Sequence, residues 1–223
     1  MAENLTNDRP PDQPWPDYLY DKVRARIVAG DLRPNAPVRQ DTLAAEFGVS
    51  KIPLREALSR LEHDGLVTLN PRRGYEVAPL DPKAVDDIFD LRLRIEPSVA
   101  ADGAKLADEA QRAKVSEALK ALNDATRAHD PRTPELNRAF HIALVEPAGR
   151  PFTSQLVERL HILAERYVRE HLKPQGRTDR AMREHEDIYD AWMARDTKRV
   201  DTLLSEHIAV TLEDLTRQLN DRG

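Results

Sequence analysis

The chain has 223 residues, of which 40% are hydrophobic, and a formal net charge of −5. This length allows two domains, each with its own core. The absence of cysteine excludes disulfides and metal sites built on thiolates. No apolar run has the length of a membrane span, and the N-terminus lacks a signal-peptide core. We therefore expect a soluble, cytoplasmic protein without a membrane partner.

Composition predicts two domains after a short leader. Residues 1–16 combine polar residues with Pro10, Pro11, Pro14 and Pro16, which is typical of a disordered segment. We place a first domain at 17–80 and a second at 81–223. Residues 18–79 carry ten lysines and arginines against eight acidic residues, so the acidic balance of the whole chain is not shared by its first domain.

Three helices are predicted at the start of the first domain. The first has an apolar seam and can end at Gly30 in the left-handed conformation; the seam consists of Leu19, Val23 and Ile27. A short second helix covers 42–47 and closes at Gly48. Only Val49 then separates that turn from Ser50, the expected N-cap of the third helix. This spacing is typical of a helix-turn-helix.

The third helix has a buried and a basic side. We expect its buried side to consist of Ile52, Leu54, Ala57, Leu58 and Leu61. Lys51, Arg55 and Ser59 recur at intervals of four and form an outward stripe. A helix that presents lysine and arginine near its N-terminus suits the major groove of DNA.

A hairpin with a basic tip follows this helix. Residues 66–70 and 75–78 resemble strands, and the turn between them carries Arg72, Arg73 and Gly74. A basic stripe on its own is more often a solvated helix face. The hairpin and the tight helix spacing favour DNA binding instead.

The second domain is predicted to be entirely helical, because apolar residues recur at intervals of three and four and glycine is nearly absent. The expected helices cover 82–106 (continuous or broken near Pro97), 108–128, 134–145, 151–172, 178–194 and 196–220. The fold class is therefore mainly α: an N-terminal winged helix-turn-helix followed by an antiparallel bundle of six to seven helices.

Three histidines of the second domain are candidate metal ligands. His141, His185 and His207 each fall on a predicted core-facing side of a different helix. Three inward imidazoles can bind Zn²⁺ or a similar divalent ion and leave further positions open. The alternative is that each is a hydrogen-bonded core residue, and their spacing alone does not decide between the two.

The chain resembles GntR-family bacterial transcription regulators of the FadR type, whose all-helical effector domain is called FCD. In the first domain the matching residues are 27–34, 43–50, 53–58, 60–61, 64–67 and 72–77. In the second they are Leu91-Arg92, Ile95-Glu96, Phe140-His141, 184–188 and Asp196 leading to His207. Two departures are Asn35, where the family usually has glycine, and Lys51-Ile52 in place of Arg-Thr. Lysine lacks the bidentate fork of arginine.

The resemblance implies a divalent metal, most simply zinc, on His141, His185 and His207. Asn137 stands where the metal-binding branch has an aspartate ligand, and its neutral carbonyl oxygen is a weaker ligand than a carboxylate. The resemblance also implies a small organic acid as effector. Arg92 is the first candidate for a second anchor on that acid, the alternative being an ion pair with Glu96.

The resemblance thus implies a homodimeric, ligand-responsive transcription factor, with repression as the expected action, on a palindromic operator. Its expected DNA-contacting residues are Arg39, Ser50, Lys51, Arg55, Arg72, Arg73 and Gly74. The alternatives are a regulator that senses the metal itself, a purely structural metal, and a three-histidine metalloenzyme. The winged helix argues against the enzyme, and we expect no catalytic residues.

Overall fold

The computed structural model describes residues 9–172, 174 and 176–220. The chain divides into two compact units, at 1–80 and 81–223. Residues 1–8 of the expected leader lie outside the described residues. Helix α1 begins at Trp15, so the prediction that disorder extends to residue 16 is wrong at its end.

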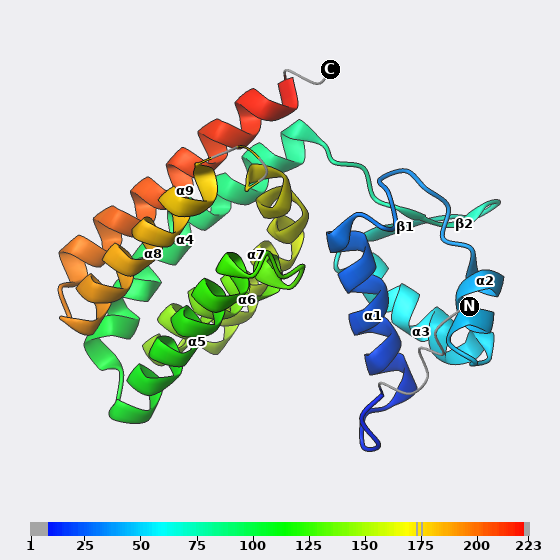
Figure 1. Cartoon of the computed structure of the whole chain (residues 1–223), viewed down its shortest axis with the longest axis horizontal. Coiled ribbons are helices and arrows are strands. Elements are labelled where there is room, and N and C mark those ends of the chain that lie inside the picture. Colours follow the sequence, from blue (N-terminus) through cyan, green and yellow to red (C-terminus); the bar gives the residue numbers. More distant parts are fainter. Residues whose placement is uncertain (1–8, 173, 175, 221–223) are drawn as a thin grey trace. The chain divides into compact units, whose positions relative to one another are not determined.

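The first unit is a winged helix-turn-helix (Figure 1). Its elements are α1 (Trp15–Ala29), α2 (Gln40–Glu46), α3 (Lys51–His63), β1 (Val67–Asn70) and β2 (Gly74–Val77). Gly30 ends α1 with a φ of 78°, a left-handed conformation that glycine adopts without steric cost. The two strands form an antiparallel hairpin in which Val67 pairs with Val77 and Asn70 with Gly74.

Helix α3 packs against both α1 and α2. Four of its apolar residues are fully buried: Leu54, Ala57, Leu58 and Leu61. Ile52 is 78% exposed, so the prediction that it belongs to the buried side is wrong. The helix begins after Ser50, as predicted, but the Ser50 side chain makes no capping hydrogen bond.

The second unit is a helical bundle. Its elements are α4 (Pro82–Leu106), α5 (Glu109–Arg127), α6 (Thr133–Val145), the 3₁₀ segment η2 (Glu146–Ala148), α7 (Pro151–His171), α8 (Arg177–Met193) and α9 (Thr197–Asn220). Helix α9 packs along α4 and α8, while α6 packs between α5 and α7 (Figure 1). Helix α4 also contacts α6, α7 and η2, and is therefore the central helix of the unit.

Helix α4 runs without a break through Pro97, although proline removes one backbone hydrogen bond from a helix interior. Six residues later, Gly103 lies against the end of α6: a Cβ atom there would be 2.2 Å from the Leu144 carbonyl oxygen. That oxygen and the Ala100 carbonyl both accept from Nε1 of buried Trp192, each at 3.1 Å. One indole thus joins α8 to α4 and α6.

None of the helices within the described residues is both long and apolar enough to cross a membrane.

Candidate nucleic-acid interface and metal centre

Four basic residues line one groove of the first unit. Arg39 precedes α2, Lys51 and Arg55 belong to the first two turns of α3, and Arg73 lies in the turn between the strands. The groove has a volume of about 370 Å³ and no large apolar side chain besides Val38 in its lining. Three separate elements thus direct positive charge to one place, which is the electrostatic arrangement that phosphate groups require.

Residues of α2 hold the two cations of α3. The Lys51 ammonium lies 2.5 Å from a carboxylate oxygen of Asp41, and Arg55 Nε donates to the Gln40 side-chain oxygen at 3.3 Å. Both contacts leave donors of the cations unused. They also restrict the side chains before any ligand binds.

The turn of the hairpin presents the remaining predicted contacts. Arg72 and Arg73 are exposed, and the Arg72 amide donates to the Asn70 side chain at 3.2 Å. Gly74 has a φ of 82°, which a residue with a side chain rarely adopts. Ser50 is exposed but does not line the groove, and neither does Arg72.

The second unit brings together the three predicted metal ligands. His141 on α6, His185 on α8 and His207 on α9 are 0%, 4% and 9% exposed. One imidazole nitrogen of each lies within 4.8 Å of the others. Two nitrogens bound to one tetrahedral zinc are about 3.4 Å apart, so small rotations of the rings would suffice to close the set.

Carboxylates determine which nitrogens are available. His141 Nδ1 lies 2.6 Å from Glu96, and His207 Nδ1 lies 2.7 Å from Glu184. A carboxylate only accepts hydrogen bonds, so each Nδ1 carries the proton and each Nε2 keeps its lone pair. Nε2 of His141 and of His185 are buried without a hydrogen-bond partner among the described residues. This pattern of oriented, unpartnered imidazoles fits a metal ion.

Glu96 is the centre of a buried hydrogen-bond network. Besides His141, its carboxylate accepts from His161 Nε2 and from Arg92 Nε, each at 3.0 Å. Burial alone would raise the pKa of Glu96, but the Arg92 guanidinium and the two imidazoles hold the pKa well below its usual range. Glu96, His141 and His161 could also be read as a metal-binding group. The direct hydrogen bonds and the adjacent guanidinium favour an ionised carboxylate that orients the imidazoles.

Burial holds His185 and His207, two of the three predicted ligands, in their neutral form. Burial lowers the pKa of His185 and His207 well below the ordinary value, and the neighbouring imidazoles and Arg92 lower it further. Burial, followed by Arg92, lowers the pKa of His161 to about 3. Neutral imidazole is the form that binds metal, so His185 and His207 need not lose a proton to bind one at neutral pH.

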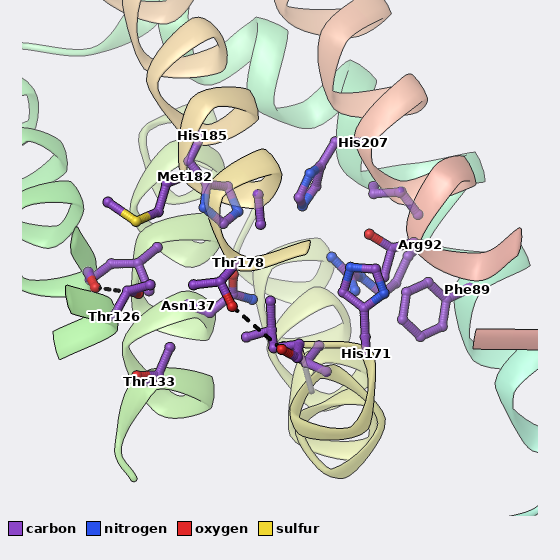
Figure 2. Close-up of a pocket in the computed structure, with 16 residues that line it drawn as sticks. Phe89, Arg92, Thr126, Thr133, Asn137, His171, Thr178, Met182, His185 and His207 are labelled. Carbon is purple, nitrogen blue, oxygen red and sulfur yellow. Dashed lines mark hydrogen bonds between the residues drawn. The ribbon is translucent and has the colours of Figure 1, made fainter. Parts of the chain in front are cut away.

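A cavity opens beside this cluster (Figure 2). Its lining includes His185, His207, Asn137 and Arg92, whereas His141 is fully buried and does not line the cavity. Threonines and apolar residues supply much of the rest, and no aspartate or glutamate appears among the described lining residues. In Figure 2, His171 and Arg92 lie on one side of the view, and Met182 and Thr126 lie on the other.

The sequence did not predict three polar residues of the site, Glu184, His161 and His171, or the hydrogen bonds of two histidines to Glu96. Their contacts join residues far apart in the chain, such as Glu96 and His161, which are 65 positions apart. A local pattern carries no signal for such pairs. The one available signal was the placement of Arg92 and Glu96 one helical turn apart, which correctly suggested their ion pair.

Two families of known proteins match the chain. The profile of bacterial regulatory proteins of the gntR family covers residues 17–77, and that of the FCD domain covers residues 87–210. The matched segments correspond to the two structural units.

Individual relatives extend over most of the chain. The HTH-type transcriptional repressor GlaR of Escherichia coli (strain K12) is 30% identical over 199 residues, which cover 85% of this chain and 90% of GlaR. The regulator YdhC of Bacillus subtilis (strain 168) is 30% identical over 190 residues, covering 80% and 82% of the two chains. The solved structure of E. coli McbR/YncC has a TM-score of 0.79 at 20% identity, covering 93% of this chain and 99% of that one. This last likeness concerns the fold alone.

Proposed function

The chain belongs to the GntR family of transcription regulators, with an FCD domain after its DNA-binding domain, and we propose that it is a homodimeric repressor whose operator affinity responds to a small organic acid. The chain is a regulator and not an enzyme. Relatives named as transcriptional repressors support the proposed sign of regulation. A regulator of chromosomal DNA acts where that DNA lies, so we propose a cytoplasmic location.

For DNA recognition we propose that α3 enters the major groove. Arg55 and Lys51 would contact base edges or phosphates, and Ser50 and Arg39 would contact the backbone. Arg72 and Arg73 would follow the adjacent minor groove, where Gly74 allows close approach of the chain. The support is the convergence of Arg39, Lys51, Arg55 and Arg73 on one groove. A dimer would place two such helices on a palindrome.

For the effector we propose a divalent metal, most simply zinc, held by His141, His185 and His207. Asn137 would lie close enough to contribute a carbonyl oxygen or a bridging water. A metal bound by neutral ligands keeps its full charge, and it supplies open positions for a carboxylate. Arg92 would be the second anchor. Its Nε donates to Glu96, but the residue also lines the cavity, and its other N–H groups would bind the acid.

The observation that carries the proposal is the charge of the cavity. Among its described lining residues, Arg92 is the one side chain with a permanent charge, and no acid belongs to the lining. Glu96, which forms an ion pair with Arg92, does not line the cavity. With a metal ion on the histidines, the cavity would hold an excess of positive charge inside a low-dielectric interior. Such a site favours an anion over a neutral or cationic ligand.

A thermal-shift screen of the zinc-loaded protein tests the effector. The panel contains small mono- and dicarboxylates, sugar acids and aromatic acids, each titrated, because a ligand of the folded state raises Tm with its concentration. We expect a hit that disappears in His185→Ala. A panel without a hit, combined with operator binding that follows free zinc, would support a metal sensor instead. A zinc content that never varies with operator binding would indicate a structural ion.

Operator binding tests the DNA interface separately. Arg55→Ala should abolish specific binding while the variant keeps its oligomeric state, zinc content and melting temperature, since Arg55 is exposed. Gel-shift titration and metal analysis of the same preparation measure both. Retained specific affinity would contradict the assignment of α3 as the recognition helix.

A further inference from the structure

One large apolar side chain stands on the outer face of α3, beside the cations of the groove. Ile52 is 78% exposed and belongs to the first turn of the helix. Residues three and four positions apart share a helix face, so Ile52 lies on the face of Arg55 and Glu56. We propose that Ile52 contacts the C5-methyl group of a thymine in the major groove and is a specificity-determining residue of this regulator. The inference rests on the proposed DNA interface.

Exposure alone would not carry this inference, because single apolar residues are common on protein surfaces. The position of Ile52 is what distinguishes it. Its neighbour Lys51 and its helix-face partner Arg55 both line the basic groove, while the apolar residues of α3 that serve the core are all fully buried. Ile52 is therefore outside the core; it does not line the groove itself, but it stands beside it, next to Lys51 and one helical turn from Arg55.

The chemistry of the side chain limits what it can recognise. Isoleucine has no polar atom, so it cannot read the hydrogen-bond donors and acceptors of the base edges. The apolar group that the major groove offers is the thymine methyl group. A β-branched side chain also has one strongly preferred χ1 rotamer in a helix, so little side-chain freedom is lost when Ile52 packs against that methyl group.

The properties of the neighbouring Lys51 make Ile52 more important for discrimination between bases. Lys51 is paired with Asp41 and presents a compact ammonium, which binds phosphate as a point charge without the bidentate fork of arginine. Lysine at this place therefore reads a guanine edge less specifically. Discrimination between bases would then rest on Arg55 and on the contact that Ile52 makes.

The test begins with an operator selected from a random duplex library by the full-length wild-type protein. Each thymine of the selected site is then replaced singly by deoxyuridine, which removes the methyl group and keeps every hydrogen-bonding atom. We expect one symmetry-related thymine in each half-site where the replacement weakens wild-type binding about fourfold, and about fifteenfold when both are replaced, as for loss of one buried methyl-sized group per half-site.

The variant Ile52→Ala should not respond to this replacement. It should bind the thymine operator about as weakly as the wild type binds the doubly substituted one, and circular dichroism should be unchanged because Ile52 is outside the core. Leu106→Ala is the matched control: it removes another apolar side chain, 59% exposed, from the helical unit, and should keep the full response to deoxyuridine.

Two results would overturn the inference: no thymine whose replacement matters, or an equal response in Ile52→Ala and the wild type. Either one leaves the proposed DNA interface intact if Arg55→Ala still abolishes specific binding. Unchanged specific binding in Arg55→Ala, or a selection that enriches no sequence, would overturn the interface and the role of Ile52 together.

Discussion

Glu96 remains ionised inside the helical unit because three donors surround it. His141, His161 and Arg92 all donate to its two oxygens, which compensates for the loss of water around the carboxylate. Glu96 therefore orients His141 without being a ligand itself. It keeps the proton of His141 on Nδ1 and directs Nε2 toward His185 and His207.

Glu96→Gln should weaken zinc binding by roughly 10- to 100-fold, the usual effect of removing a carboxylate that orients a histidine ligand. The glutamine amide has one acceptor oxygen where the carboxylate has two. Competition with a chelator measures the affinity. Glu165→Gln is the matched control, because Glu165 is also a buried acid that accepts from an arginine, Arg138. It should lose stability but keep zinc affinity, and equal zinc affinities in all three proteins would contradict the role of Glu96.

Asn137→Asp should raise zinc affinity and lower affinity for the acid effector. Aspartate adds a charged oxygen ligand one helical turn before His141, and it cancels one unit of the positive charge that attracts an anion. Chelator competition and calorimetric titration of the acid measure the two affinities. Unchanged values for both would show that residue 137 is outside the coordination sphere.

His171 should make the metal-free protein less stable in mild acid. Burial, followed by Arg177, lowers the pKa of His171 to about 4, whereas an unfolded histidine titrates near 6.5. Between these values the unfolded state binds the extra proton, so stability is complete above about pH 6.5 and falls as the pH decreases toward 4.

His171→Gln removes this titration. Its free energy of unfolding should therefore decline less than that of the wild type between pH 7 and 5, by about 1–2 kcal/mol. Urea titrations at both pH values provide the comparison. Parallel declines in the two proteins would mean that His171 is protonated equally in the folded and unfolded states.

At the scale of elements, α4 determines how closely the bundle packs. Gly103 allows its backbone to approach the Leu144 carbonyl at the end of α6, and the Trp192 indole binds the same carbonyl from α8. A methyl group at residue 103 cannot be accommodated without moving the backbone of one helix, since the obstructing atom is a backbone oxygen.

Gly103→Ala should accordingly destabilise the helical unit by about 1–3 kcal/mol, in the range of other overpacked cores, even though alanine is the better helix former. Lys105→Ala, at an exposed position of the same helix, should have little effect. Urea denaturation followed by circular dichroism measures both. A neutral or stabilising Gly103→Ala would show that α4 and α6 can separate at little cost.

Helix periodicity predicted the elements well, because the local sequence determines it. The range 82–106 was predicted and is observed for α4, and the other helices of the bundle begin and end within one residue of prediction. Asp108 forms a capping box with Gln111 at the start of α5. The hairpin and the position of the Ser50 cap were also predicted, and Pro97 leaves α4 unbroken.

What the sequence did not predict depends on contacts between distant residues or on the surface. Ile52 fits the apolar periodicity of α3 but lies outside the contact with α1 and α2. Periodicity does not show how far toward the end of a helix its packed face extends. Glu184 contacts His207 on α9, 23 positions along the chain. Such pairings depend on how the helices pack together.

At the scale of the whole molecule, the proposed function couples two sites in different units. Thermodynamic linkage requires that the factor by which the acid lowers operator affinity equals the factor by which operator DNA lowers acid affinity. For the acid found by the screen we expect a factor of about 5–150, the usual range of such couplings.

Calorimetric titrations of the acid into free protein and into the protein–operator complex measure one factor, and gel shifts with and without the acid measure the other. In His185→Ala the effect of the acid on operator affinity should vanish. Unequal factors in the wild type would mean that the acid or the DNA also changes a third equilibrium, such as the oligomeric state.

The two tryptophans of the chain fall one in each unit, Trp15 in α1 and Trp192 in α8. Trp192 is fully buried, whereas Trp15 is partly exposed and lies under the Arg9 guanidinium. Indole emission shifts to the blue in apolar surroundings, so we expect the helical unit to emit at shorter wavelength than the DNA-binding unit. A Trp15→Phe protein would carry a single tryptophan, placed at the junction of α4, α6 and α8. Its fluorescence would report on the helical unit alone while both units remain in one chain.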